Sequence, residues 1–122
     1  MYGSPLGYAA SVGDVGSINA LLKAGAKVNG KSLYGNTALM HAAESGNPDA
    51  VKALLMAGAD VNARDDDGRD ALKYARLGFS LRVSTENSPF PSERMPDYRS
   101  KFKSIEGLLR SAGASGDQVD PE

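Results

Sequence analysis

The chain has 122 residues, a length that fits one domain with a buried core. It contains 14 Lys and Arg against 15 Asp and Glu, and this near-neutral charge argues against non-specific binding to nucleic acid or to a membrane surface, because both need a strong positive field. There is no Cys, which excludes disulfide scaffolds, thiol catalysis and Cys-bound metals.

The sequence repeats itself with a period of 33 residues. Residues 21–29 and 54–62 are nearly identical, and 54 − 21 = 33. The same offset links Leu6, Leu39 and Leu72. A third copy of the closing segment ends at Ala114, which lies 114 − 59 = 55 residues after Ala59, so this copy contains 55 − 33 = 22 additional residues. A fixed period of this length is typical of proteins built from stacked units.

The first copy lacks most of its leading turn, so the middle copy shows the unit best. Residues 37–45 are compact and rich in Ala, which favours a helix, and Gly46 permits the left-handed turn that ends it. Asn47 suits the cap of a second helix and Pro48 its first helical position. Apolar residues then follow at helical spacing: Val51, Leu54 and Leu55.

A hairpin-like connection follows the second helix of the unit. Gly58 is expected to end that helix, and residues 60–69 carry a turn at Gly68, which suits an extended link to the next unit. Each unit is therefore predicted to be a turn, a short helix, a second turn and a second helix. Two short helices cannot bury a core alone, so the copies are expected to stack into a solenoid.

The last copy is interrupted near residues 79–96. Its first helix is expected to end near Gly78, and three prolines predict a loop over residues 79–95, namely Pro89, Pro91 and Pro96. Pro96 also suits the first turn of the final helix, which we expect to be about two turns longer than its counterparts. Its apolar face is predicted to consist of Tyr98, Phe102, Ile105, Leu108 and Leu109.

Two interpretations of the insertion remain open from the sequence. In the first, the loop folds back and caps the open end of the stack with Leu81, Val83 and Phe90, because terminal units need atypical caps. In the second, Phe90 and its neighbours form a docking element, since long loops often carry function. Residues 115–122 are small and acidic, and this tail is expected to be disordered.

The repeated residues resemble a known family. The second copy reads Gly-Asn-Thr-Ala-Leu-Met-His-Ala-Ala over residues 35–43 and closes with Leu-Leu-Met-Ala-Gly-Ala-Asp-Val-Asn over residues 54–62. This pattern resembles the ankyrin repeat, and the resemblance covers about residues 3–78 and 97–114. It implies an all-α solenoid of helix-turn-helix pairs joined by β-hairpin-like loops, with repeats at about 1–31, 32–64 and 65–114.

The resemblance also implies a protein-binding module whose concave face is built from hairpin tips and first helices. Carried over position by position, the partner-binding residues would be Lys31, Leu33, Tyr34, Asn36, Glu44, Ser45, Arg64, Asp66, Asp67, Arg69 and Leu77. An adjacent apolar and aromatic pair at an exposed tip, Leu33 and Tyr34, suits an interface anchor. The aspartates Asp66 and Asp67 favour a partner with a basic segment.

The sequence supports catalysis or metal binding less well than it supports a repeat fold. The single His41 is expected to pack between helices, and the run Asp65-Asp66-Asp67-Gly68 lacks the later Glu that an EF-hand loop requires. No carboxylate pair or nucleophile–base spacing stands out. We therefore predict no enzyme activity, no catalytic, cofactor-binding or metal-binding residue, and no cofactor.

The sequence thus favours a non-catalytic interaction module, an adaptor or regulatory scaffold that is monomeric and cytoplasmic and binds neither nucleic acid nor membrane. No apolar run approaches the ~18 residues of a membrane-spanning helix, and the first five residues lack the basic start and apolar core of a secretory signal. One alternative is a structural terminal segment of a longer ankyrin array or multidomain protein. A less favoured one is a metal-binding or catalytic protein that uses His41 or the aspartates.

Overall fold

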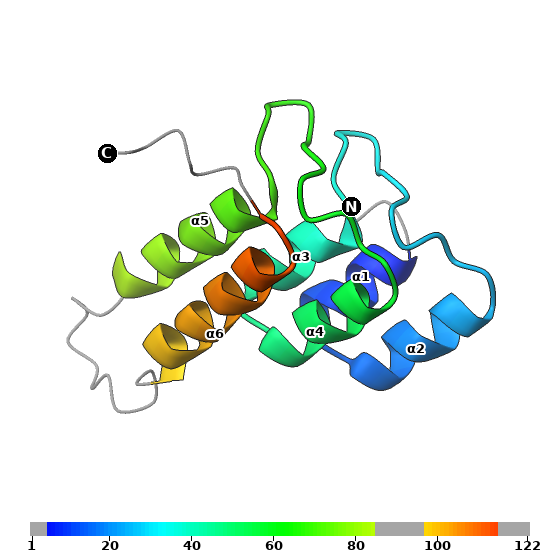
Figure 1. Ribbon diagram of the computed structural model, residues 1–122, viewed down its shortest axis with the longest axis horizontal. Coiled ribbons are helices and arrows are strands. Elements are labelled where there is room, and N and C mark those ends of the chain that lie inside the picture. Colours follow the sequence, from blue (N-terminus) through cyan, green and yellow to red (C-terminus); the bar gives the residue numbers. More distant parts are fainter. Residues whose placement is uncertain (1–4, 85–96, 115–122) are drawn as a thin grey trace.

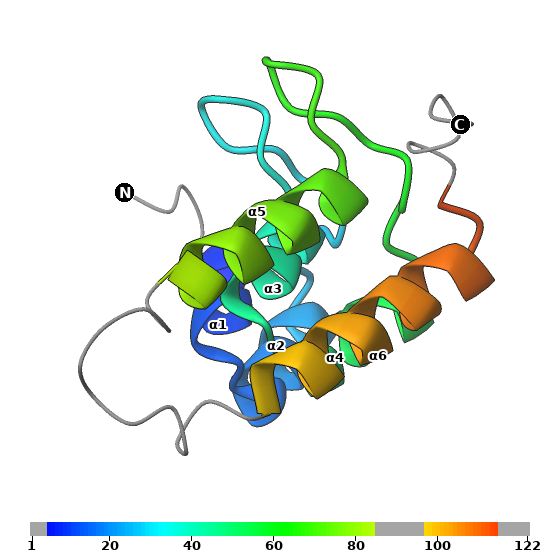
Figure 2. The same cartoon turned by 90° about the vertical axis from the view of Figure 1, so that its left-hand side faces the viewer.

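The computed structural model describes residues 5–84 and 97–114, and the described part contains six helices and no strand. In chain order they are α1 (Pro5–Val12), α2 (Val15–Lys23), α3 (Ala38–Ser45), α4 (Pro48–Met56), α5 (Ala71–Ser84) and α6 (Asp97–Ser111). The first helices of the units, α1, α3 and α5, form one layer, and α2, α4 and α6 form the other (Figures 1 and 2). Neighbouring units contact each other within each layer, which confirms the predicted all-α solenoid.

The middle unit folds as its sequence predicts. Thr37 caps α3 by accepting a hydrogen bond from the Met40 N–H at 3.4 Å, and Gly46 ends the helix with a φ of 77°. Pro48 opens α4 and Asn47 is its N-cap residue. The Asn47 side chain does not cap its own helix; it donates to the Ser11 carbonyl oxygen of the preceding unit at 3.3 Å.

A continuous apolar core lies between the two layers. Its largest side chains come from both layers and are almost fully buried: Ile18, Leu39, Met40, Val51, Leu54, Leu72, Ile105 and Leu109. Burying a side chain of this size contributes about 1.5–3 kcal/mol to folding. Because every unit supplies residues to the same core, no unit is stabilised by its own two helices alone.

The final helix is longer than its counterparts, as predicted. It has 15 residues, whereas α2 and α4 have 9 each, and the six extra residues amount to about 1.7 turns. Ile105 and Leu109 are buried, and Phe102 and Leu108 pack against the core, so the predicted apolar face is confirmed over these residues. The side chain of Tyr98 lies outside the described residues, as does Pro96.

The prediction that the preceding helix ends near Gly78 is wrong. Helix α5 continues through Gly78 to Ser84, so residues 79–84 are helical and not part of a loop. A Cβ atom at Gly78 would lie 2.1 Å from the Glu44 carbonyl oxygen. Glycine is therefore needed here because α3 and α5 approach closely, and not because the helix stops.

The rest of the insertion falls beyond what the structure describes. Residues 85–96, including Phe90, and the tail at 115–122 lie outside the described residues, as do the side chains of Leu81 and Val83. The capping and docking interpretations of the insertion therefore both stay predictions. Among the helices of the described ranges, none is long and apolar enough to cross a membrane.

Candidate functional site

Two loops project from the same side of the array, between α2 and α3 and between α4 and α5 (Figures 1 and 2). We call them the first hairpin, residues 32–36, and the second hairpin, residues 65–69. In the first hairpin, the Ser32 N–H donates to the Asn36 carbonyl oxygen at 2.9 Å and the Gly35 N–H donates to the Ser32 carbonyl oxygen at 2.9 Å. These two bonds close the turn.

The second hairpin closes in the same way, 33 residues later. The Asp65 N–H donates to the Arg69 carbonyl oxygen at 2.9 Å, and the Gly68 N–H donates to the Asp65 carbonyl oxygen at 2.9 Å. The Asp65 carboxylate adds two bonds, because its Oδ1 accepts from the N–H groups of Asp67 and Arg69, both at 2.9 Å. The second hairpin is therefore braced from within by a side chain that the first hairpin lacks.

The two hairpins are joined at their tips. The Asp66 N–H donates to the Tyr34 carbonyl oxygen at 3.0 Å. A Cβ atom at Gly35 would lie 2.8 Å from an Asp66 carboxylate oxygen, so the missing side chain lets this carboxylate lie against the first hairpin. Lys31 adds a contact from its Nζ to the Arg64 carbonyl oxygen at 3.1 Å. The tips therefore form one surface.

A polar network below the tips connects both hairpins to α5. The Tyr74 hydroxyl donates to Asp65 Oδ2, and the Asn36 side-chain amide donates to the Tyr74 hydroxyl oxygen at 2.7 Å. Both Asp65 and Tyr74 are buried. The network thus fixes the orientation of the hairpins relative to the helices.

The ionisation of the network follows from its burial and its hydrogen bonds. Burial opposes the charged form of Asp65, but hydrogen bonds from Tyr74, Arg69 and Asp67 outweigh it and hold the pKa of this carboxyl below its ordinary value. Burial, and then the hydrogen bond to Asp65, raises the pKa of the Tyr74 hydroxyl. At neutral pH the pair is therefore a carboxylate accepting from a neutral phenol.

The predicted tip residues are exposed. Leu33 is 82% exposed and Tyr34 is 68% exposed, although both are large and largely apolar. Asp66 and Asp67 are also exposed. The structure thus places an apolar pair and an acidic pair side by side on adjacent hairpins.

The other predicted residues of these loops all make hydrogen bonds or ion pairs within the chain. Lys31 and Arg64 are exposed, but each donates to a main-chain carbonyl oxygen, Arg64 to that of Gly68 at 2.9 Å. Arg69 forms ion pairs with Asp65 at 3.8 Å and with Asp67 at 3.5 Å. Asn36 is half-buried in the network, which gives it a bracing role.

The first helices contribute a second row of side chains. Glu44 and Ser45 on α3 are half-buried, and Leu77 on α5 is 37% exposed. Sequence reasoning missed Tyr8 and Val12 on α1, which are 54% and 55% exposed. The repeat offset could have indicated Val12, because 12 + 33 = 45 places it in register with the predicted Ser45; Tyr8 is in register with His41, which was expected to pack between helices, so the offset gave no signal for it.

His41 and Asp65, two residues that could carry chemistry, are half-buried and buried in the fold. His41 is half-buried on α3; burial lowers its pKa, and the charge of Glu44 acts in the opposite direction. The Asp65 carboxylate, the first of the three aspartates, is occupied by the hairpin bonds and by Tyr74. Over residues 5–84 and 97–114, no group of three His, Asp or Glu side chains is placed to hold a metal ion.

Comparison with known proteins agrees with this architecture. Residues 2–79 match the family description of ankyrin repeats, in three copies. Among solved structures, a chain in the complex of the predatory endopeptidase Bd0816 from Bdellovibrio bacteriovorus with the immunity protein Bd3460 matches with a TM-score of 0.68 and 24% identity. The match covers 93% of this chain and 48% of that one, so the chain spans about half the length of its structural relative. No curated protein sequence matches the chain.

Proposed function

The chain belongs to the ankyrin repeat family, and from this premise we propose that it is a non-catalytic protein-recognition module, an adaptor or regulatory scaffold. Ankyrin repeats are generally protein-interaction modules, and the structural relative was solved in a complex of two proteins. The partner is proposed to bind the concave face formed by the two hairpin tips and the helices α1, α3 and α5.

One observation carries this proposal: the exposed large apolar side chains gather on these elements. Six such side chains are exposed in the described part of the chain, and five of them belong to the hairpin tips and first helices: Tyr8, Val12, Leu33, Tyr34 and Leu77. Only Met56 of these six belongs to the opposite layer. Exposed aromatic and apolar groups on rigid elements are the usual anchors of protein interfaces.

The acidic pair supports a partner with a basic segment. Asp66 and Asp67 are exposed beside Tyr34, so an approaching Lys or Arg would meet two carboxylates and an aromatic ring. Arg69 already pairs with Asp67 and moderates this charge. Raising the salt concentration should therefore weaken binding without abolishing it, because the apolar anchors are not screened.

The proposal has three further parts: the chain is not an enzyme, it is monomeric, and it works in the cytoplasm. The hydrogen bonds and burial of Asp65, Tyr74 and Asn36 favour the first part, because they give these polar groups a structural role.

The test is affinity capture from a lysate of the source cells with three baits. The intact chain is compared with a tip variant, in which Leu33, Tyr34, Asp66 and Asp67 are changed to Ser, and with a back variant. The back variant changes three exposed residues of α2 and α4 to Ser: Lys23, Lys52 and Met56. All three baits must first show the same helical circular dichroism spectrum.

We expect a protein that binds the intact chain and the back variant and is lost by the tip variant. A protein retained by the tip variant but lost by the back variant would place recognition on the opposite layer and contradict the proposal. If none of the baits retains a protein, the structural-segment alternative is favoured over recognition.

A further inference from the structure

Two equivalent turns of the array each carry an asparagine, and only one of these asparagines is followed by glycine. In the first unit, Asn29 lies in a turn that the Gly30 N–H closes by donating to the Lys27 carbonyl oxygen at 3.1 Å. The same turn recurs 33 residues later, where the Ala63 N–H closes it at 3.3 Å. Asn29 and Asn62 therefore occupy equivalent positions, but glycine follows the first and alanine the second.

The residue that follows an asparagine determines how easily its side-chain amide is lost. Asparagine is a chemically labile residue, and the reaction is easiest before glycine, which has no Cβ to crowd the ring that forms. At this dipeptide the Gly30 nitrogen attacks Asn29 Cγ, and the side-chain nitrogen leaves as ammonia with the proton of the attacking N–H. Water then opens the resulting succinimide at either carbonyl carbon, which gives aspartate or isoaspartate.

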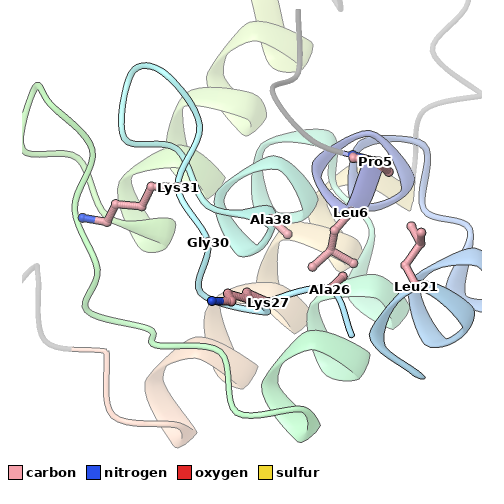
Figure 3. Close-up of a pocket in the computed structure, with 8 residues that line it drawn as sticks. All are labelled: Pro5, Leu6, Leu21, Ala26, Lys27, Gly30, Lys31 and Ala38. Atoms are coloured by element: carbon pink, nitrogen blue, oxygen red, sulfur yellow. The ribbon is translucent and has the colours of Figure 1, made fainter. Parts of the chain in front are cut away.

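Solvent reaches both residues of this dipeptide. Asn29 and Gly30 are exposed, and Gly30 lines a pocket of about 270 Å³ beside α1. Figure 3 shows Gly30 on the loop between Lys27 and Lys31, at the edge of this pocket. In the whole sequence, Asn29 is the only asparagine that precedes a glycine. The chain therefore has one site at which this reaction is favoured.

In the folded chain, hydrogen bonds engage both reacting groups. The Asn29 side chain donates to the Gly58 carbonyl oxygen at 3.2 Å and accepts from the Asp60 N–H at 2.7 Å, and both partners belong to the next unit. The attacking N–H of Gly30 is bonded to the Lys27 carbonyl oxygen. Attack requires these bonds to break, so the fold protects the dipeptide until the first unit separates locally from the second.

A lysine beside the dipeptide helps to hold the two units together. Lys31 donates from Nζ to the Arg64 carbonyl oxygen of the next unit at 3.1 Å. Lys27 lies at the same distance in sequence on the other side of Asn29 and is also exposed. Within residues 5–84 and 97–114, its side chain makes no hydrogen bond or ion pair. The two lysines thus form a matched pair, of which only one bridges the units.

The products of the reaction cannot restore the original contact. An aspartate at position 29 can still accept from the Asp60 N–H, but its carboxylate has no proton to donate to the Gly58 carbonyl oxygen, and the two oxygens repel each other. Isoaspartate also adds a carbon atom to the main chain of the turn. Because the first hairpin begins at residue 32, its bond from the Asp66 N–H to the Tyr34 carbonyl oxygen should loosen as well.

We propose that Asn29 is a deamidation site, and that its conversion to aspartate or isoaspartate uncouples the first unit of the array from the second. The hydrogen bonds between these units control the rate of conversion. The reaction needs only water, and the released ammonia makes the loss of the amide one-way. This proposal does not depend on the proposed function.

The first test compares the two equivalent asparagines. The intact chain is incubated at neutral pH, with and without urea above its unfolding transition, and conversion at Asn29 and Asn62 is followed by peptide mass spectrometry. We expect conversion at Asn29 well ahead of Asn62, and at least about tenfold faster in urea, because local opening is rare in the folded chain. Gly30→Ala should suppress conversion without unfolding the chain, since Ala63 occupies the equivalent position.

Two lysine variants test whether the contact between units controls the rate. Lys31→Met should speed conversion of the folded chain about threefold, which corresponds to a loss of about 0.6 kcal/mol, whereas Lys27→Met should leave the rate unchanged. In urea the two variants should convert alike, which separates the contact from any effect of charge on the reaction.

A variant that carries the product tests the consequence. Asn29→Asp should melt at a lower temperature than the intact chain, and its Asp66 amide should exchange hydrogen faster. Any of four results would overturn the proposal: equal conversion at Asn29 and Asn62, equal rates in the folded and unfolded chain, equal rates in the two folded lysine variants, or an unchanged melting temperature of Asn29→Asp.

Discussion

The two hairpins close in the same way but present different tips. Both have the same pair of main-chain bonds at 2.9 Å and a glycine with positive φ, 82° at Gly35 and 80° at Gly68. The first hairpin carries Leu33 and Tyr34 at its tip, whereas the second carries Asp66 and Asp67. Closure is therefore determined by the glycines and the main chain, and the tip residues are free to determine what the surface binds.

The hairpins also differ in what holds them in place. The second is anchored from within by the buried Asp65, and the first is held from outside by its contacts to Asp66 and Tyr74. The first hairpin therefore depends on the second for its position. Substitutions in the two hairpins test this asymmetry, and their expected effects on stability decrease from Gly35 to the exposed first tip.

The largest effect is expected for Gly35→Ala compared with Gly68→Ala. Both changes place a Cβ at positive φ, which costs about 1 kcal/mol. At Gly35 the Cβ would also lie 2.8 Å from an Asp66 carboxylate oxygen and 3.0 Å from the Asp66 nitrogen, whereas at Gly68 nothing lies within 4 Å. We expect losses of about 3 kcal/mol for Gly35→Ala and about 1 kcal/mol for Gly68→Ala, measured by urea unfolding. Equal losses would show that the hairpins do not approach each other this closely.

Removing the anchor of the second hairpin should come next. Asp65→Ala leaves the Tyr74 hydroxyl and the N–H groups of Asp67 and Arg69 without their acceptor, and we expect a loss of about 2 kcal/mol in the free energy of unfolding. The equivalent change in the first hairpin, Ser32→Ala, removes one hydroxyl contact to Asn36 at 3.2 Å and should cost about 0.5 kcal/mol. A larger loss for Ser32→Ala would reverse the proposed order of anchoring.

The lowered pKa of the Asp65 carboxyl also predicts that the stability of the fold depends on pH. Because the folded-state pKa of Asp65 lies below its unfolded value, its ionisation stabilises the fold above pH about 4, and this stabilisation is lost as the pH falls further through the lowered pKa. Thermal unfolding between pH 7 and about 2.5 should therefore decline less steeply in Asp65→Asn than in the intact chain. Parallel curves would show that Asp65 is not ionised in the way described.

The smallest effect on stability is expected at the first tip. Leu33→Ser and Tyr34→Ser should each change the free energy of unfolding by less than about 0.5 kcal/mol, because both side chains are exposed. Thermal melts of the two variants provide the measurement. A loss above about 1 kcal/mol would mean that the tip is part of the fold.

Repetition made much of this fold predictable. The 33-residue offset predicts the order of helices and hairpins, because each unit repeats its apolar positions and its turn glycines. The length of α6 was predictable for a similar reason, since Phe102 and Ile105 continue its apolar face backwards. These features depend on residues close in sequence, which a pattern can show.

Features that depend on distant partners were not predictable. A glycine that ends a helix and a glycine where two helices approach closely look alike in sequence, so the helix was wrongly predicted to end near Gly78. Only the structure shows the reason for this glycine, which is the nearby Glu44 carbonyl oxygen on α3. Asn36 looked like a tip residue because its partner, Tyr74, lies on α5. Tyr8 was not predictable from the offset, because the equivalent positions in the later units, His41 and Tyr74, are half-buried and buried.

The central claim is that the hairpin tips serve recognition and not stability. The most direct test measures the Kd of the captured partner for the intact chain, the tip variant and the back variant, together with their melting temperatures. The account predicts that the tip variant melts like the others but binds at least about 100-fold more weakly, as expected when interface anchors are removed. Equal affinity of the tip and back variants, at equal stability, would contradict it.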